Sequence, residues 1–387
     1  MAKIVEAKLK EKVISILTKQ GYIVNSNGFV LKDDSIEVKR DAHVFAKAER
    51  INRSENFIID SIDLVRQYMV DGKNLDIEKI DPQIIEVKTG SKYEKIFRWW
   101  NLVWWSLPYE RAYGRQMRFI IWDRYHKAPI GLIGLQSPIL SWSIRDSYLG
   151  ITKEKRDYWV NQSLSAQRLG ALPPYNYILG GKLVASLMTS SVIRKKFENK
   201  YKDQKTIIKN RKLPSKLLFI TTTGAYGKSS VYNRLKFNDD YISKFIGYTH
   251  GSGSFHIPNN IYEDFLMYLK ERDYDIKRGY GAGPSRKLRL INQAMECLGI
   301  SNGTNHGIKR AIYLFPLAKN LKSVISDNKR PKWFNRNIKD LTSFWQERWA
   351  MPRSKKRKEY TDFSADKFIK DTVEEIEKYK KLHNSAK

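Results

Sequence analysis

Two glycines and two tyrosines lie around a predicted strand-to-helix junction in the run LLFITTTGAYGKSSVYNRLKF, residues 217–237. The apolar, β-branched stretch 217–223 predicts a buried strand, and Ser229 and Ser230 are favourable residues for opening a helix. Glycines at such a junction let backbone N–H groups face an anion. The residues predicted to hold a phosphate-containing ligand here are Gly224, Tyr226, Gly227, Ser229 and Ser230.

A second glycine pair has the same setting. The run LGGKL, 179–183, predicts another helix that starts at a glycine, where Gly180, Gly181 and Lys182 would hold an anion. Strands that feed two such helices predict an α/β or α+β core between about 115 and 272. This arrangement resembles the GNAT acetyltransferase fold, which implies that the loop holds the pyrophosphate of an acyl-CoA. The resemblance also implies a helix tyrosine as the acid, and Tyr232 matches it.

Other side chains are suited to proton transfer. Asp146 follows Arg145 and is either a general base or the partner of Arg145 or Arg115 in an ion pair. His250 and His256 flank GSGSF, where they bind a phosphate, shuttle a proton, or are held structurally by the backbone. The catalytic candidates are thus Tyr232, Asp146 and His256.

Two stretches partly match common catalytic motifs, the P-loop and the core of restriction-type nucleases. In GAYGKSS, 224–230, two residues separate the glycines, whereas a P-loop has four between its first Gly and its Gly-Lys pair, so NTP hydrolysis is not predicted. The run 80–90 resembles the core of restriction-type nucleases through Asp81, Glu86 and Lys88, which keeps a nuclease as an alternative. Neither histidine has a carboxylate or cysteine at a metal-ligand spacing, so no metal is expected.

The charge of the chain is strongly positive, with a formal net charge of +30 from 71 Lys and Arg against 41 Asp and Glu. Residues 1–80 hold 14 basic and 13 acidic side chains, so almost all of the surplus lies in 81–387. Nucleic acid is the partner that this surplus favours, because neutralising phosphates releases counterions. The alternatives are a solubilising surface or an acidic protein partner.

The basic residues are clustered in 193–216, which has ten basic and two acidic residues and is predicted to be a loop or frayed helix, and in 353–360. Aromatic residues interleave with cations just before the second cluster, at Trp333 and Trp345 among others, where they either stack bases or form a core. The predicted nucleic-acid-binding residues are Lys195, Lys196, Lys209, Arg211, Lys212, Arg234, Arg353, Lys355, Lys356 and Arg357.

The cysteine content and apolar stretches indicate a cellular setting. A single cysteine, Cys297, excludes an internal disulfide framework and indicates a reducing, cytoplasmic environment. The start of the chain is amphipathic and charged, unlike a signal peptide. The longest apolar stretch, 129–142, is too short and too polar to span a bilayer, so no membrane partner is expected.

The periodicity of apolar residues predicts the elements. The predicted helices are 4–20, 40–70, 92–107, 181–188, 259–271, 285–298 and 366–382; the predicted strands are 22–24, 28–31, 117–122, 130–135 and 144–151. The expected domains are a mainly helical N-terminal domain, 1–80, a GNAT-like α/β core, 81–272, and a basic, aromatic-rich helical C-terminal region, 273–387. The fold class is therefore predicted as α+β, with a GNAT-like central mixed sheet flanked by helical regions.

A set of sequence blocks in the same order, spread over roughly 30–360, resembles the DruA proteins of the Druantia anti-phage system. The blocks are RAYGRQMRF (111–119), IGLIGLQSP (130–138), SIRDSYLGI (143–151), LGALPPYNYILGGKLVASL (169–187), TTTGAYGKSSVYNRLKF (221–237), IGYTHGSGSFHIP (246–258), GAGPSRKLRLI (281–291), HGIKRAIYLFPLAKN (306–320) and ERWAMPR (347–353). The resemblance implies bacterial phage defence with DNA as the target.

Three hypotheses about function follow. Mom-type DNA base modifiers have a similar glycine and tyrosine layout, so the first is an acyl-group transferase that modifies a nucleobase. The second is a non-catalytic DNA-recognition component that acts with a helicase and other Druantia components. The third is a nuclease or transposition-related enzyme.

Overall fold

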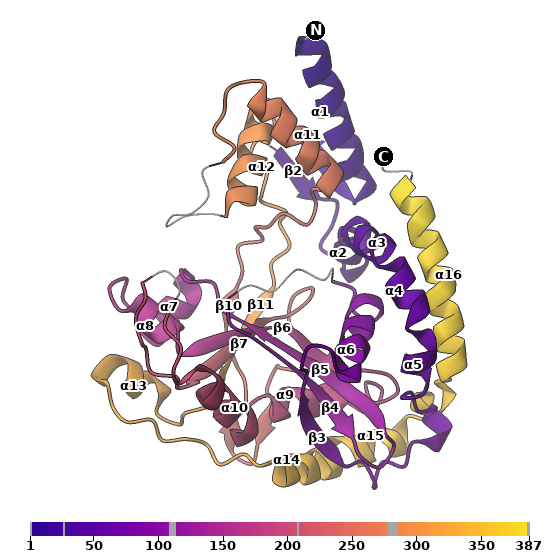
Figure 1. Ribbon diagram of the computed structural model, residues 1–387, viewed down its shortest axis with the longest axis vertical. Coiled ribbons are helices and arrows are strands. Elements are labelled where there is room, and N and C mark those ends of the chain that lie inside the picture. Colours follow the sequence, from indigo (N-terminus) through magenta and orange to yellow (C-terminus); the bar gives the residue numbers. More distant parts are fainter. Residues whose placement is uncertain (1, 26–27, 108–113, 207–208, 278–284, 385–387) are drawn as a thin grey trace.

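The computed structural model describes residues 2–25, 28–107, 114–206, 209–277 and 285–384, and its centre is a seven-stranded sheet in the order β10–β11–β7–β6–β5–β4–β3 (Figure 1). These strands span Pro82–Glu86 (β3), Gln116–Asp123 (β4), Ala128–Gln136 (β5), Ser163–Ala171 (β6), Phe219–Thr223 (β7), Lys244–Tyr248 (β10) and Ala311–Pro316 (β11). Of the neighbouring pairs, β6 and β7 run parallel and the others antiparallel. The sheet and its flanking helices confirm the predicted α+β class.

The middle strands are apolar on both faces. β5 is buried at every position except its last, which requires cover on both sides of the sheet. It pairs with β4 from Gln116 opposite Gln136 to Asp123 opposite Ala128, so the pairing predicted for 117–122 and 130–135 is confirmed.

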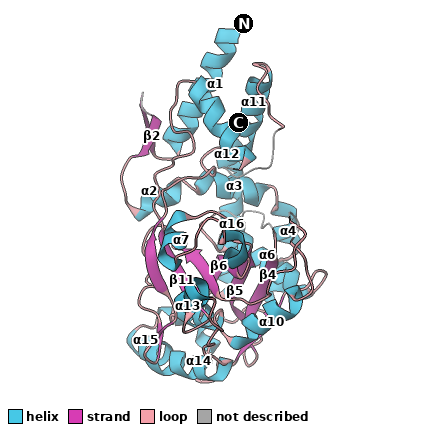
Figure 2. Cartoon of the chain, turned by 90° about the vertical axis from the view of Figure 1, so that its left-hand side faces the viewer, coloured by secondary structure: helices cyan, strands magenta, loops and turns pink. Residues whose placement is uncertain are grey.

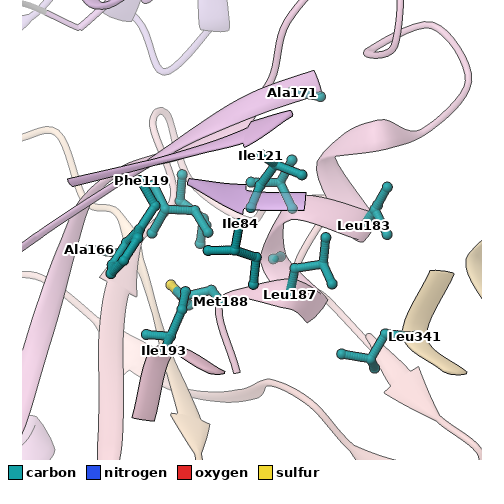
Figure 3. Close-up of a cluster of buried hydrophobic side chains, with 14 of the residues drawn as sticks. Ile84, Phe119, Ile121, Ala166, Ala171, Leu183, Leu187, Met188, Ile193 and Leu341 are labelled. Atoms are coloured by element: carbon teal, nitrogen blue, oxygen red, sulfur yellow. The ribbon is translucent and has the colours of Figure 1, made fainter. Parts of the chain in front are cut away.

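One face of the sheet is covered by α9 (Gly180–Leu187), α10 (Ser191–Tyr201) and α14 (Ile338–Trp345). Figure 3 shows Ile84 of β3 among side chains from these helices, including Leu187 and Ile193. Trp345 is fully buried, and its Nε1 donates to the Leu179 carbonyl at 3.0 Å, which fastens α14 to the start of α9. For this tryptophan the core alternative is therefore correct.

The other face is covered by α3 (Val44–Asn52), α6 (Lys92–Val103) and the C-terminal α16 (Ala365–Asn384). Figure 1 shows α16 lying along α3, α4 (Glu55–Asp60) and α5 (Ile62–Arg66). The Phe368 ring stacks on Trp100 with centroids 5.3 Å apart. The N-terminal segment 44–66 and the C-terminal helix are thus packed on the same side of the sheet.

A second lobe lies beyond one end of the sheet and has its own apolar cluster (Figures 1 and 2). It contains α1 (Ala2–Lys19), the hairpin of β1 (Tyr22–Asn25) and β2 (Gly28–Leu31), α11 (Asn259–Lys270) and α12 (Arg286–Cys297), which confirms these predicted elements. α11 and α12 lie in the sequence between β10 and β11, two strands of the central sheet. The lobe therefore consists of a segment inserted between these strands together with the N-terminal elements α1, β1 and β2. The expected boundary at 272 falls between these two helices, and β11 lies within the sheet that the earlier strands form.

The strand predicted at 144–151 is wrong, because α7 (Ser143–Leu149) is a helix there. Arg145, Asp146 and Leu149 are its buried residues, a helical spacing, and Gly150 ends the helix with a φ of 69°, in the left-handed region. α7 packs near β10 beside α8 (Arg156–Val160) and α13 (Leu321–Asp327). The remaining short elements are α2 (Ile36–Asp41), α15 (Met351–Lys356), β8 (Lys236–Phe237) and β9 (Asp240–Tyr241), with single helical turns at Gly72–Asn74, Gln346–Ala350 and Glu359–Asp362.

Candidate nucleic-acid interface

The glycine loop after β7 folds back onto β11. The Gly224 N–H donates to the Ala311 carbonyl at 2.8 Å, and the Ala311 N–H donates to the Gly227 carbonyl at 3.2 Å. A side chain at Gly224 would collide with the Gly227 carbonyl oxygen, and Gly227 has a φ of 134°. Both glycines are therefore required by the tightness of the turn itself.

The helix expected to open on Ser229 and Ser230 is absent, which corrects that prediction. Residues 229–234 form a turn instead, in which the Asn233 N–H donates to the Ser229 carbonyl at 2.9 Å. Arg234 has a φ of 59°, a left-handed conformation that ends any right-handed helical path at this point. The Ser229 N–H is bound by the Tyr313 hydroxyl at 2.9 Å, so it is not directed at a ligand.

The two glycine sites contact each other. α9 does begin at Gly180, as predicted, but the turn after β7 lies over its N-terminus. The Lys182 ammonium donates to the Ser230 and Val231 carbonyls at 3.1 and 3.4 Å, and a Cβ on Gly181 would lie 3.3 Å from Val231. The Gly180 N–H is bound to the Tyr175 carbonyl at 2.8 Å. These residues do not fit the pyrophosphate of an acyl-CoA, because the helix end is covered by protein.

Tyr232 is buried behind this turn. Its hydroxyl donates to the Leu169 carbonyl at 2.7 Å, and burial raises the pKa of Tyr232 above its usual value. The hydroxyl thus points into the sheet. Tyr226, in the glycine loop, lies edge-on to His43 with ring centroids 6.0 Å apart.

Asp146 is held by two arginines. Its carboxylate lies 2.6 Å from Arg145 and 2.9 Å from Arg156, and it accepts the Trp142 N–H at 3.2 Å near the start of α7. Arg115, the other partner considered, donates instead to Asn161 at 2.9 Å. The geometry is that of a structural ion pair, with Arg156 as a partner that the sequence did not suggest.

His256 belongs to a buried cluster at the junction of the two lobes. Its Nε2 lies 2.8 Å from the Gly303 carbonyl, and burial lowers its pKa from 6.5 to about 4, so the ring is neutral. His306 lies 6.0 Å away between ring centroids, and its pKa is likewise lowered by burial, to about 3. His43 stacks on Phe255 at 3.8 Å.

The residues of this cluster come from distant segments of the sequence, and the sequence analysis did not predict that they meet. The Arg310 guanidinium lies 2.9 Å from Nε2 of His43, whose Nδ1 lies 2.8 Å from the Lys39 carbonyl. His43 comes from the connection between α2 and α3, whereas Arg310 immediately precedes β11. No regular spacing joins such residues along the chain, so only their contacts in the folded protein identify them. His250, by contrast, is exposed.

A basic hollow of about 470 Å³ lies beside α10. The cations that line it are Arg194 of α10, Lys202 and Lys216 from the first basic cluster, and Arg330 from a distant segment. Its acid is Glu198, which pairs with Arg194 at 2.8 Å. The Arg194 guanidinium also lies 4.4 Å from the centroid of the Trp333 ring, which forms part of the wall.

Several of the predicted DNA-binding residues outside this hollow are paired with acids. Lys209 and Arg211 both reach Asp157, Lys212 lies 3.4 Å from Asp203, and Lys196 lies 3.3 Å from Glu86. Lys195 is exposed on α10. In the segment 193–216, predicted to be a loop or frayed helix, α10 runs to Tyr201, and the remaining residues that the structure describes form no regular helix or strand.

The second basic cluster lies on α15, away from the first in sequence. Lys355 and Lys356 line another hollow, of about 460 Å³, with Glu347. Arg353 donates to the Tyr177 carbonyl at 3.3 Å, and Arg357 pairs with Glu359 at 3.6 Å. Arg234 is exposed in the turn after β7.

The described residues contain no helix that is long and apolar enough to cross a membrane. Within the same ranges, no three side chains of His, Cys, Asp or Glu converge in a way that could hold a metal ion.

The fold and the charge define an α+β protein with a large excess of basic residues. Comparison with known proteins identifies its family. Residues 33–327 match the family model described as Druantia protein DruA. Over 361 residues the chain is 34% identical to Druantia protein DruA of Escherichia coli (strain UMEA 4076-1), covering 92% of this chain and 89% of that protein. The chain belongs to the DruA family, as its sequence blocks indicated. No solved structure matches it.

Three of the family blocks come together at the junction between sheet and lobe. Blocks 221–237, 246–258 and 306–320 meet at the glycine loop and the histidine cluster. The first residues of two others, 111–113 and 281–284, lie outside the described residues.

Proposed function

We propose that this chain is a DNA-binding protein of bacterial phage defence, acting in the cytoplasm as a recognition component alongside a helicase and other Druantia components. Membership of the DruA family supports the defence role. The observation that carries DNA binding is the basic hollow beside α10, because it concentrates part of a +30 charge at one concave place.

The electrostatic balance of this hollow favours a polyanion. Glu198 is already neutralised by Arg194, which leaves the charges of Lys202, Lys216 and Arg330 for a ligand. Phosphates spaced along a nucleic-acid backbone can contact several such cations at once, and each contact releases counterions.

Recognition fits the geometry better than base modification. An acyl-transfer mechanism needs an open cofactor loop and an accessible acid, whereas Val231 lies against the start of α9 and the Tyr232 hydroxyl is engaged by Leu169. A GNAT-like core that modifies a nucleobase is therefore not the function we favour. A nuclease is disfavoured because Glu86 pairs with Lys196 and Lys200, and Asp81 pairs with Arg124.

The test is a charge reversal at the hollow. In the triple variant Lys202→Glu, Lys216→Glu and Arg330→Glu, we expect duplex DNA affinity to fall roughly tenfold or more at low salt. The slope of log K against log salt should flatten by roughly 2–3, because about three phosphate contacts are lost. Fluorescence anisotropy with a labelled 20-base-pair duplex over a range of salt concentrations measures both quantities.

The matched control makes the same change in net charge elsewhere. Lys8, Lys95 and Lys378 are exposed on α1, α6 and α16, and their reversal to Glu should lower affinity far less and keep most of the slope. Equal losses in both triples would mean that binding depends on net charge and not on the hollow. Absence of DNA binding by the unaltered chain would overturn the proposed function.

A further inference from the structure

Two aromatic rings stand exposed together on the outermost strand of the sheet. Phe245 and Tyr248 of β10 keep 41% and 40% of their surface accessible, and their ring centroids are 5.1 Å apart. Large aromatic side chains are usually covered in a folded protein. A pair of them side by side in the described structure therefore points to a ligand with flat apolar faces.

A bulge places both rings on the same face. In a regular strand, residues three apart point to opposite faces. Here the pairing of β10 with β11 shifts between Phe245 and Gly247, so Phe245 lies opposite Tyr313 and Tyr248 lies opposite Ala311. Ile246, the extra residue, packs instead with the apolar cluster on the other face.

The two faces of β10 differ in their cover. On the side of Ile246, α7 approaches so closely that a Cβ on Gly247 would lie 2.9 Å from Ile144. On the side of the two rings, the centroid of the Phe245 ring lies 6.1 Å from that of Tyr313, so Phe245 packs against this tyrosine of β11. The rings thus rest on the core and face outward.

A lysine completes the surface. The Lys228 ammonium, carried by the glycine loop, lies 5.8 Å from the centroid of Phe245. The loop is fixed there by the bond from the Ser229 N–H to the Tyr313 hydroxyl at 2.9 Å. The tight glycine turn therefore positions a cation beside the rings, where a phosphate next to a stacked base would lie.

We infer that this aromatic platform, formed by Lys228, Phe245 and Tyr248, stacks unpaired bases of single-stranded DNA; this rests on the proposed DNA-binding function and deepens it. Exposed rings beside cations are the usual means of holding single strands without base-specific hydrogen bonds. Duplex bases are already stacked and present no free face. The platform therefore distinguishes single-stranded from double-stranded DNA, whereas the basic hollow binds backbone phosphates of either.

The alternative occupant of an outer strand is a strand of another protein, which pairs through the backbone edge. Such a partner has no need of two rings that project from the face, nor of a lysine beside them. The charge of the chain also favours an anionic ligand.

The experiment compares two DNA forms bound to the full chain. Affinity for labelled fifteen-nucleotide oligo(dT) and for a fifteen-base-pair duplex is measured with the variant Phe245→Ala/Tyr248→Ala. We expect single-strand affinity to fall roughly tenfold or more, since loss of one stacked base typically weakens binding by roughly 5- to 150-fold. Duplex affinity and both salt slopes should stay unchanged, because neither substitution alters charge.

Tyr125→Ala is the matched control. Tyr125 is 52% exposed and lies 5.2 Å from the Lys79 ammonium, but it follows β4, which is separated from β10 by four strands. Its loss should leave both affinities unchanged. Photocrosslinking of 5-iododeoxyuridine-substituted oligo(dT) to the unaltered chain should label the peptide that contains Phe245 and Tyr248.

Other results overturn the inference and separate it from the proposed function. If the double variant keeps full single-strand affinity while the chain still binds duplex with a steep salt slope, the platform fails and DNA binding stands. If the variant loses single and double strands equally, the platform does not select unpaired bases. If it changes only the oligomeric state in sedimentation, β10 is a protein interface.

Discussion

At the scale of single residues, the hydrogen-bond partner of a polar side chain shows whether its role is structural or chemical. Tyr232 was suited to act as an acid, but its hydroxyl is buried and donates to the Leu169 carbonyl. We expect Tyr232→Phe to lower the free energy of unfolding by about 1–2 kcal/mol, because the carbonyl then lacks its donor. Urea unfolding followed by circular dichroism measures this, and DNA affinity should be unaffected.

The control for this substitution is Tyr177→Phe, since Tyr177 is exposed. Its free energy of unfolding should change by less than about 0.5 kcal/mol. A result in which Tyr232→Phe keeps full stability but abolishes an acyl mass added to nucleosides would restore the catalytic role.

At the scale of elements, the fit of α9 onto the sheet depends on a glycine in β5. A Cβ on Gly131 would lie 2.5 Å from Val184 of α9 and would also collide with the Gly170 carbonyl of β6. We expect Gly131→Ala to lower the free energy of unfolding by roughly 1–3 kcal/mol through overpacking. The midpoint of urea unfolding measures the change.

Gly170 provides a control in the adjacent strand, because the nearest atom to its added Cβ is 3.5 Å away on Trp105. Gly170→Ala should therefore fold with nearly unaltered stability. If both alanine variants behave alike, the close approach of α9 and β5 is not what limits side-chain size at Gly131.

At the scale of the whole molecule, the joint between sheet and lobe contains neutral histidines, which makes stability depend on pH. Burial lowers the pKa of His256 to about 4 from 6.5, so the unfolded chain binds more protons than the folded one between these values. The free energy of unfolding should fall as the pH drops below about 6.5. For His256 the loss approaches about 3 kcal/mol by pH 4.

Urea midpoints at pH 7.5, 6 and 5 check this expectation. His256→Gln should give a shallower dependence on pH than the unaltered chain, whereas His250→Gln should leave the dependence as it was, because His250 is exposed. Identical pH dependence in all three proteins would show that the pKa of His256 does not change on folding. His43 and His306 should add to the effect with the same sign.

Much of the fold could be predicted from the sequence, because local patterns decide it. The periodicity of apolar residues located α1, α11, α12 and α16, and two apolar runs around a turn located β4 and β5. The prediction at 144–151 was wrong because a short apolar stretch is compatible with either strand or helix until its buried spacing is known.

The candidate site was only partly predictable. The stretch 193–216 was recognised as basic, but Arg330 and Trp333, which complete the hollow, come from more than 100 residues away. Phe245 and Tyr248 lie on the same face because of a bulge in β10 against β11. The sequence of β10 alone does not predict this bulge.

By itself, the sequence determined the family, the α+β class and the excess of positive charge, because these follow from residue identity and short-range order. Tertiary structure alone decided which polar groups remain open to a ligand. Packing against Val231 covered the start of α9, and Leu169 engaged Tyr232. A backbone N–H or a hydroxyl is chemically the same wherever it stands, and contacts from distant segments decide whether it meets solvent, a ligand or the protein's own carbonyls.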